Sequence, residues 1–240
     1  MKRQGFTLIE MIITMIVGSI LVVGIAGFVE LGARGYADTV DRQRLQTQAK
    51  FVLEKITREV RHAVPNMFSQ NAVVPGSRCV SFFPIVTSGI YAMSGDDIQF
   101  VTADNALTAA VLAPLSLVIN PTEATPTNND FPLATVTATN NTFLLANESG
   151  NLVGNSVSNR HYIYNPNGRV NYCIVNGRVW RSEGNGALIP ISDTGVTGDL
   201  DYQPANVQRN GVVHLEFEFR NQVGDELTNF QQDIQVINVP

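Results

Sequence analysis

The chain has 240 residues, of which 44% are hydrophobic and 15% charged, so it is long enough for one folded domain plus a further segment. Its formal net charge of −5 is uneven: up to His62, nine basic and six acidic residues give +3, and the rest of the chain gives −8. The acidic remainder excludes a typical nucleic-acid-binding domain, which needs a basic face.

The first predicted element is an apolar segment near the N-terminus. Met11 to Val29 contains no charged residue, and nineteen residues in a helix span the ~30 Å hydrocarbon core of a membrane. Lys2 and Arg3 precede the segment, so the positive-inside rule places the N-terminus in the cytoplasm and the rest of the chain across the membrane. The alternative is a secretory signal cleaved within residues 24–35, although such signals have shorter apolar runs of ~7–15 residues.

The segment starts with "MKRQGFTLIEM", and one carboxylate, Glu10, lies at the beginning of the apolar run. A charge within a membrane span is costly and indicates a functional partner. This start resembles the class III signal of type IV pilins and type II secretion pseudopilins, in which a basic leader ends in glycine and is followed by phenylalanine and a glutamate. The resemblance implies that prepilin peptidase cuts between Gly5 and Phe6 and that Phe6 is then N-methylated. It also implies that Glu10 pairs with the new Phe6 amine of a neighbouring subunit.

The apolar segment continues into a predicted amphipathic helix. No proline occurs before Pro65, and apolar residues recur at steps of three and four from Leu45 to Val64. We expect one helix from about Thr7 to His62, with its first half in membrane or filament core and its second half packed on a globular domain.

Several glycines interrupt the apolar half of this helix, at positions 18, 24, 27, 32 and 35. We interpret them as sites of close packing in a membrane helix, with local unwinding as the alternative. Major type IV pilins commonly carry a helix-breaking proline near the place of Gly27. Its absence here favours a minor pilin or a pseudopilin.

Beyond Pro65, short segments rich in Val, Ile, Phe and Tyr predict strands. Residues 212–219 alternate between apolar and polar, as a strand with one buried face does. Asn-Gly pairs predict hairpin turns at 165–168 and 175–179, and residues 121–132 predict a surface loop. The expected fold is therefore α+β and pilin-like, with a long N-terminal helix packed on an antiparallel β-rich domain.

The predicted domain boundaries follow from these elements. Residues 1–5 form the leader peptide, 6–30 the transmembrane or filament-core helix, 31–64 the amphipathic helix, and 65–240 a periplasmic globular domain. Cys79 and Cys173 then lie on predicted strands in an oxidising compartment, where a disulfide is expected. Two buried free thiols are the alternative.

Patches of the sequence resemble one subfamily more closely. Residues 160–184 and 233–240 are similar to O-type minor pilins of mannose-sensitive haemagglutinin (MSHA) pilus biogenesis, and 49–66 also to J-type and W-type minor pilins. The resemblance implies an inner-membrane subunit that later enters the base or tip of a pilus. Its implied partners are other major and minor pilins, prepilin peptidase, the inner-membrane assembly platform and the lipid bilayer.

Enzymatic motifs are not apparent. His62, His161 and His214 are scattered, and the sequence shows neither Cys/His metal spacing nor a phosphate-binding loop. We therefore expect a non-enzymatic subunit without a cofactor or metal. Calcium ligation by Asp193, Asp199 and Asp201 is a minor alternative, since Asp-Gly turns look the same.

Two further functions stay open. One is a J-type minor pseudopilin of a type II secretion system. The other is an adhesive module displayed at a pilus tip, for which the loop at 121–132 is a candidate contact.

Overall fold

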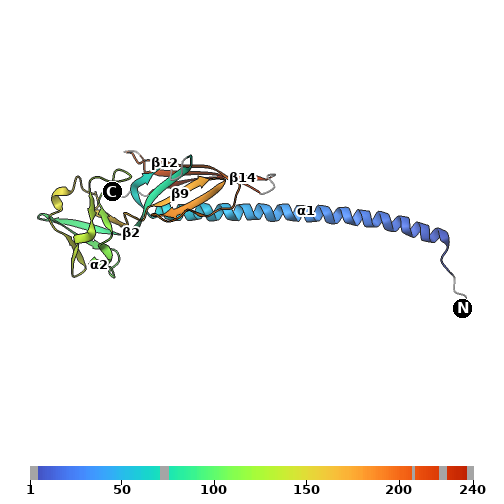
Figure 1. Cartoon of the computed structure of the whole chain (residues 1–240), viewed down its shortest axis with the longest axis horizontal. Coiled ribbons are helices and arrows are strands. Elements are labelled where there is room, and N and C mark those ends of the chain that lie inside the picture. The colour runs from blue at the N-terminus through green and yellow to red at the C-terminus, as the bar shows by residue number, and fades with distance from the viewer. Residues whose placement is uncertain (1–4, 71–75, 207–208, 222–225, 237–240) are drawn as a thin grey trace. The chain divides into compact units, whose positions relative to one another are not determined.

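One long helix and two antiparallel sheets make up the chain in a computed structural model, which describes residues 5–70, 76–206, 209–221 and 226–236 (Figure 1). The chain forms two units, Met1–Gln46 and Thr47–Pro240, and helix α1 (Leu8–Arg61) contributes to both. The α+β prediction is confirmed. Lys2 and Arg3 of the predicted leader lie outside the described residues, as does the end of the 233–240 motif.

The last turns of α1 supply one side of the globular core. Ala49, Val52, Ile56 and Val60 are fully buried and recur at steps of three and four, so the predicted amphipathic periodicity is correct here. The outward positions carry charged residues such as Glu54 and Arg58, both exposed. Burial of this stripe fixes how these turns of α1 face the core of the globular unit.

The helix ends within one residue of the expected end at His62, and three residues before the predicted domain boundary at residue 64. It stops at Arg61, and β1 (Ala63–Ser69) begins two residues later. Pro65 accounts for the difference, because a residue that precedes proline is disfavoured in the α conformation. Val64 therefore adopts an extended backbone, and Ala63 pairs with β2 (Arg78–Ser94).

The larger sheet has eleven strands, and its central path runs β11-β10-β9-β2-β3-β7-β6. All strand pairs among the described residues are antiparallel. Besides β1, the strands of this sheet are β2 (Arg78–Ser94), β3 (Asp97–Thr102), β4 (Ser116–Val118), β5 (Asp130–Pro132), β6 (Thr137–Thr139), β7 (Thr142–Leu145), β8 (Arg160–Tyr164), β9 (Val170–Val175), β10 (Arg178–Glu183) and β11 (Ile189–Pro190). Three short helical turns connect them, α2 (Ala109–Leu112), η1 (Leu133–Thr135) and η2 (Ser149–Asn151).

The long strand β2 organises the larger sheet. Along one edge it pairs first with β9 and then with β8, and along the other edge with β1 and then β3. Gly89 lies where β3 and β8 flank β2 together, and a Cβ atom there would lie 1.8 Å from the Val101 carbonyl oxygen. Glycine is therefore required at this crossing.

The two predicted Asn-Gly turns have different outcomes. Asn176 and Gly177 form the two-residue turn of the β9–β10 hairpin, both with positive φ, as a type I′ turn demands. The turn at 165–168 forms too, but it does not close a hairpin. It joins β8 to β9, and both of these strands pair with β2 instead of with each other. The hairpin prediction was wrong because a turn signal does not specify which strand its neighbours will pair with.

The predicted loop at 121–132 is partly correct. Residues 122–128 are irregular and mostly exposed, whereas Asp130–Pro132 form β5, which pairs with β4. Phe131 explains the difference, because its side chain is buried in the core cluster around β3, β4 and β7.

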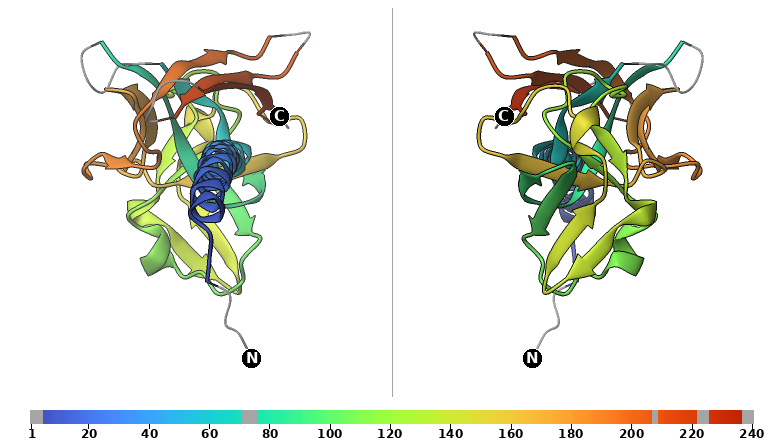
Figure 2. Two further views of the ribbon diagram at one scale, coloured as in Figure 1. Left: turned by 90° about the vertical axis from the view of Figure 1, so that its right-hand side faces the viewer. Right: turned by 90° about the vertical axis from the view of Figure 1, so that its left-hand side faces the viewer.

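The smaller sheet contains β12 (Val196–Gln203), β13 (Val212–Arg220) and β14 (Leu227–Gln235). Figure 2 shows these orange-to-red strands apart from the green and yellow strands of the larger sheet. Val213, Leu215, Phe217 and Phe219 are buried, and the intervening residues are more exposed. The predicted alternation along this strand is confirmed.

Candidate processing and assembly site

The peptide bond between Gly5 and Phe6 lies in irregular chain just before α1. No other part of the described chain comes within 4 Å of the place where a Cβ of Gly5 would be. Phe6 is also exposed, with 79% of its surface accessible. The described part of the chain therefore leaves both residues of this bond open to contact with a peptidase.

The residue after Phe6 sets the start of the helix. Thr7 accepts a hydrogen bond on its Oγ1 from the backbone N–H of Glu10, at 3.4 Å, and its carbonyl accepts from Glu10 and Met11. Thr7 is thus the N-cap, and Thr7 to Glu10 match the T-x-x-E pattern of a capping box. Our sequence analysis missed this role of Thr7, although the spacing to Glu10 was a usable signal.

Glu10 lies in the first turn of α1, where its carboxylate is exposed. A negative charge at a helix N-terminus is favoured by the helix dipole. Among the described residues the carboxylate forms no ion pair. The described part of its own chain therefore leaves Glu10 available to a cation from another molecule.

The helix that follows Glu10 presents apolar side chains on all sides. Between Leu8 and Val40 the large apolar residues are 42 to 79% exposed. By length and composition this helix can cross a membrane. The Thr14 and Ser19 hydroxyls donate to the carbonyls of Met11 and Ile16, so these polar groups are satisfied within the helix and tolerate a lipid environment.

The glycines do not interrupt the helix. Residues 18, 24, 27, 32 and 35 are all helical, and no neighbouring atom lies within 4 Å of their would-be Cβ positions. Each leaves a shallow place on the apolar surface where another helix can approach closely. Unwinding at these positions remains a prediction.

The comparisons with known proteins bear on this same segment. Residues 1–26 carry a prokaryotic N-terminal methylation motif. Comparison with curated proteins found no match, and neither did comparison with solved structures. The methylation motif indicates a type IV pilin-like structural protein that prepilin peptidase processes and whose partners include other pilins. With the apolar helix, it indicates a protein anchored in the membrane by a single span.

A charged cluster joins the last turns of α1 to the larger sheet. The Glu59 carboxylate accepts from Lys55 on the same helix and from Arg181 on β10, each at 3.0 Å. Burial alone would raise the pKa of Glu59, but the hydrogen bonds from Lys55 and Arg181 outweigh it and lower the pKa. Arg181 also pairs with Glu183, so the guanidinium bridges two carboxylates. We did not anticipate the pair of Glu59 with Arg181, since these two residues are 122 positions apart in the sequence.

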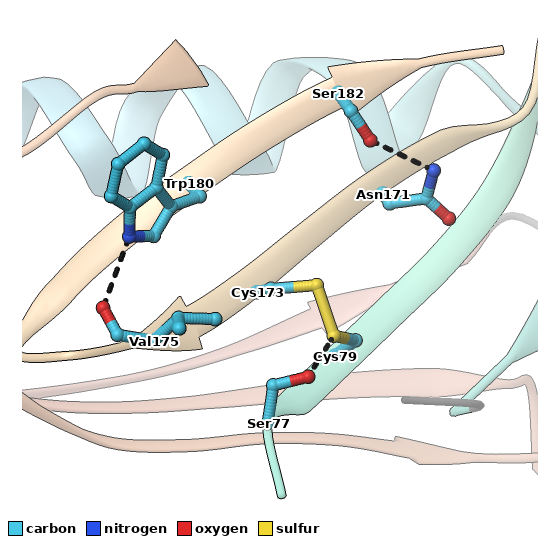
Figure 3. Close-up of a disulfide and its surroundings, with 7 residues drawn as sticks. All are labelled: Ser77, Cys79, Asn171, Cys173, Val175, Trp180 and Ser182. Atoms are coloured by element: carbon cyan, nitrogen blue, oxygen red, sulfur yellow. Dashed lines mark hydrogen bonds between the residues drawn. A yellow bond between two sulfur atoms is a disulfide. The ribbon is translucent and has the colours of Figure 1, made fainter. Parts of the chain in front are cut away.

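A disulfide joins Cys79 on β2 to Cys173 on β9. These residues are directly opposite in the strand register, and both are buried (Figure 3). The Ser77 hydroxyl lies 3.1 Å from the Cys79 Sγ. The expected bridge is therefore present and ties together segments that are 94 residues apart.

The three histidines occupy unrelated places. His62 is exposed in the turn after α1, and His214 on β13 pairs with Asp233 on β14. His161 on β8 is fully buried against the Phe100 ring, and neither ring nitrogen has a hydrogen-bond partner among the described residues. Burial lowers the pKa of His161 to about 4, which keeps it neutral at physiological pH.

The aspartates considered for calcium have other partners. Asp199 forms an ion pair with Arg78, and Asp201 accepts a hydrogen bond from Gln70 at 2.6 Å. Across the described parts of the chain, no three His, Cys, Asp or Glu side chains are grouped to hold a metal ion. The structure thus adds no support for a calcium site at Asp193, Asp199 and Asp201.

Proposed function

We propose that this chain is a minor pilin or pseudopilin that takes part in initiating the assembly of a type IV-like pilus of the MSHA type. The observation that carries the proposal is a methylation motif placed ahead of a helix whose apolar surface is exposed on all sides. Such a surface needs lipid first and neighbouring helices afterwards.

Processing is the first step of this proposal. Prepilin peptidase cuts the exposed bond between Gly5 and Phe6 on the cytoplasmic side, and Phe6 is then N-methylated. The new α-amine of Phe6 is cationic around neutral pH. It lies one residue before the N-cap Thr7, so the charge arises at the very start of α1.

Docking follows from the charge that cleavage creates. The Phe6 amine of one subunit pairs with Glu10 of its neighbour when apolar helices pack side by side. The pair offsets the desolvation of both charges, and a misplaced helix would leave each of them buried alone, at several kcal/mol. The pair therefore favours one axial stagger between subunits.

The partners follow from this route. The chain is inserted in the inner membrane with its N-terminus in the cytoplasm and its globular domain in the periplasm. There it meets the lipid bilayer, prepilin peptidase, the assembly platform and other major and minor pilins. It then enters the base or tip of the pilus.

Substitutions at Glu10 test docking against the simpler role of helix capping. Glutamine serves in a capping box as well as glutamate does but carries no charge. We expect Glu10→Gln and Glu10→Ala both to be processed normally and both to be excluded from the pilus fraction. Glu54→Ala, at an exposed position of the same helix, is the control and should be incorporated normally. If Glu10→Gln were incorporated normally while Glu10→Ala was excluded, Glu10 would only cap its helix.

A deletion separates the two assembly systems that the motif allows. Loss of surface pili after deletion of the gene, restored by the wild-type chain, supports the pilus role. Loss of protein secretion with intact pili would instead identify a pseudopilin of a type II secretion system.

A further inference from the structure

A pocket in the globular unit is separate from every residue assigned above to processing and docking. Its volume is about 230 Å³. Residues from four segments that are distant in sequence line it: β1, the chain after β4, the start of β8, and residues 206, 209 and 210 after β12. Ligand pockets for drug-sized molecules measure ~300–1,000 Å³, so this one suits a smaller ligand.

Two arginines give the pocket its charge. Arg160 and Arg209 both line it, both are exposed, and none of the described lining residues is acidic. Neither guanidinium pairs with a carboxylate among the described residues. By contrast, Arg78, Arg181 and Arg220 on the same unit each form such a pair. Within the described structure, the pocket thus holds two positive charges without a carboxylate partner, in a chain whose net charge is −5.

Both arginines are held by polar neighbours. The Arg209 guanidinium donates to the Gln203 side chain at 2.7 Å, and its backbone N–H donates to the Asn206 side chain at 2.9 Å. The Arg160 backbone N–H donates to the Ser156 hydroxyl at 3.0 Å. Burial raises the pKa of Tyr162, and the adjacent Arg160 charge partly opposes that rise, which places the guanidinium beside the phenol. The Arg209 fork is therefore partly oriented before any ligand arrives.

Asparagine amides occupy much of the remaining wall. Asn66 lies where β1 departs from regular pairing with β2, and its amide donates to the Pro121 carbonyl at 2.9 Å. Asn120, Asn206 and Asn210 also line the pocket. An amide both donates and accepts hydrogen bonds, so it matches a hydroxyl group in either role. Because Asn66 and Asn206 already have hydrogen-bond partners, Asn120 and Asn210 are the amides that the wall offers to hydroxyls, next to two anion-binding groups.

We propose that this pocket binds a small, hydroxyl-rich anion, the chemistry of an acidic monosaccharide. A guanidinium binds carboxylate or phosphate with two parallel hydrogen bonds. Arg160 and Arg209 take the anionic group, and the Asn120 and Asn210 amides take the hydroxyls. The site would let the β domain recognise an acidic glycan independently of the N-terminal segment.

The test measures binding to the full chain in detergent micelles by calorimetry. The probes are glucuronate, which has both the charge and the hydroxyls, glucose, which lacks the charge, and acetate, which lacks the hydroxyls. We expect saturable glucuronate binding that is at least about tenfold tighter than that of either control probe. Glucose 6-phosphate, run in parallel, identifies the preferred anionic group, and the proposal holds with either preference.

Matched arginine variants complete the test. Arg160→Gln and Arg209→Gln should each weaken glucuronate binding by about tenfold or more. Arg178→Gln, on β10 and outside the pocket, makes the same charge change and should leave binding unaltered. Absence of glucuronate binding, equal binding of acetate or glucose, or an equal loss in Arg178→Gln would overturn the proposal. None of these outcomes depends on cleavage or pilus assembly, so the proposed function is judged separately.

Discussion

The two halves of α1 use apolar residues for opposite purposes. From Leu8 to Val40 the large apolar side chains face outward on all sides, whereas Ala49, Val52, Ile56 and Val60 form one buried stripe. The first half therefore depends on lipid or on other subunits to cover it, and the second half is covered by its own globular unit. A continuous helix thus joins a segment built for assembly to a segment built for folding.

The disulfide tests how far the globular unit stabilises itself. Cys79→Ser combined with Cys173→Ser should lower its free energy of unfolding by about 4–5 kcal/mol, because the bridge closes a loop of 94 residues. Denaturant unfolding of the full chain in micelles measures this loss. Reduction of the wild-type protein should reproduce it, and unchanged stability after reduction would contradict the account.

Matched isoleucines test the contrast within α1 directly. Ile56 is fully buried and Ile16 is 53% exposed in the same helix. Ile56→Ala should destabilise the globular unit by about 2–5 kcal/mol. Ile16→Ala should change its unfolding by less than about 0.5 kcal/mol. Equal effects of the two substitutions would show that the halves do not differ in this way.

Ionisable groups also differ between the exposed first half of α1 and the globular unit. Glu10 is exposed, whereas His161 is buried without a hydrogen-bond partner among the described residues. The folded protein resists protonating His161, because its pKa is lowered to about 4 from an ordinary value of 6.5. Its contribution to stability is therefore complete above pH ~6.5 and is lost as the pH falls toward 4, by about 3 kcal/mol.

Unfolding measured across this pH range, for the wild type and for His161→Leu, isolates the histidine. The difference between the two curves should decline by the stated amount toward acid. A constant difference would show that His161 is already accommodated in its charged form.

Ion pairs give the smallest expected contrast. Arg181 and Glu59 are 23% and 22% exposed, whereas Arg34 and Glu30 are 74% and 62% exposed. Arg181→Met should cost about 1–3 kcal/mol, because it leaves Glu59 half-buried with one partner fewer. Arg34→Met should cost less than about 0.5 kcal/mol. Thermal unfolding of the two variants in the same detergent compares these costs.

The sequence was most informative where structure follows from local pattern. The helix, the alternation along β13 and the Asn176-Gly177 turn each depend on residues close together in the chain. The turn at 165–168 was misinterpreted because its flanking strands find a distant partner, β2, in place of each other. Pairing between remote strands leaves little trace in a single sequence.

The functional residues also divide into those that a local sequence pattern predicts and those that only the fold brings together. Gly5, Phe6 and Glu10 belong to one short motif, so the pattern alone points to them. Thr7 was overlooked as a cap although its spacing to Glu10 was visible. The Glu59–Arg181 pair and the Arg160–Arg209 pocket could not be anticipated, because the fold brings their members together from distant segments.

The most direct test of the account is mass spectrometry of the chain and of its N-terminal peptide, after the chain has been expressed with its prepilin peptidase. The account predicts a mature chain that begins at Phe6, carries one added methyl group and retains the whole apolar helix. A chain that retains Met1, or one cut within residues 24–35 that has lost the helix, would contradict it.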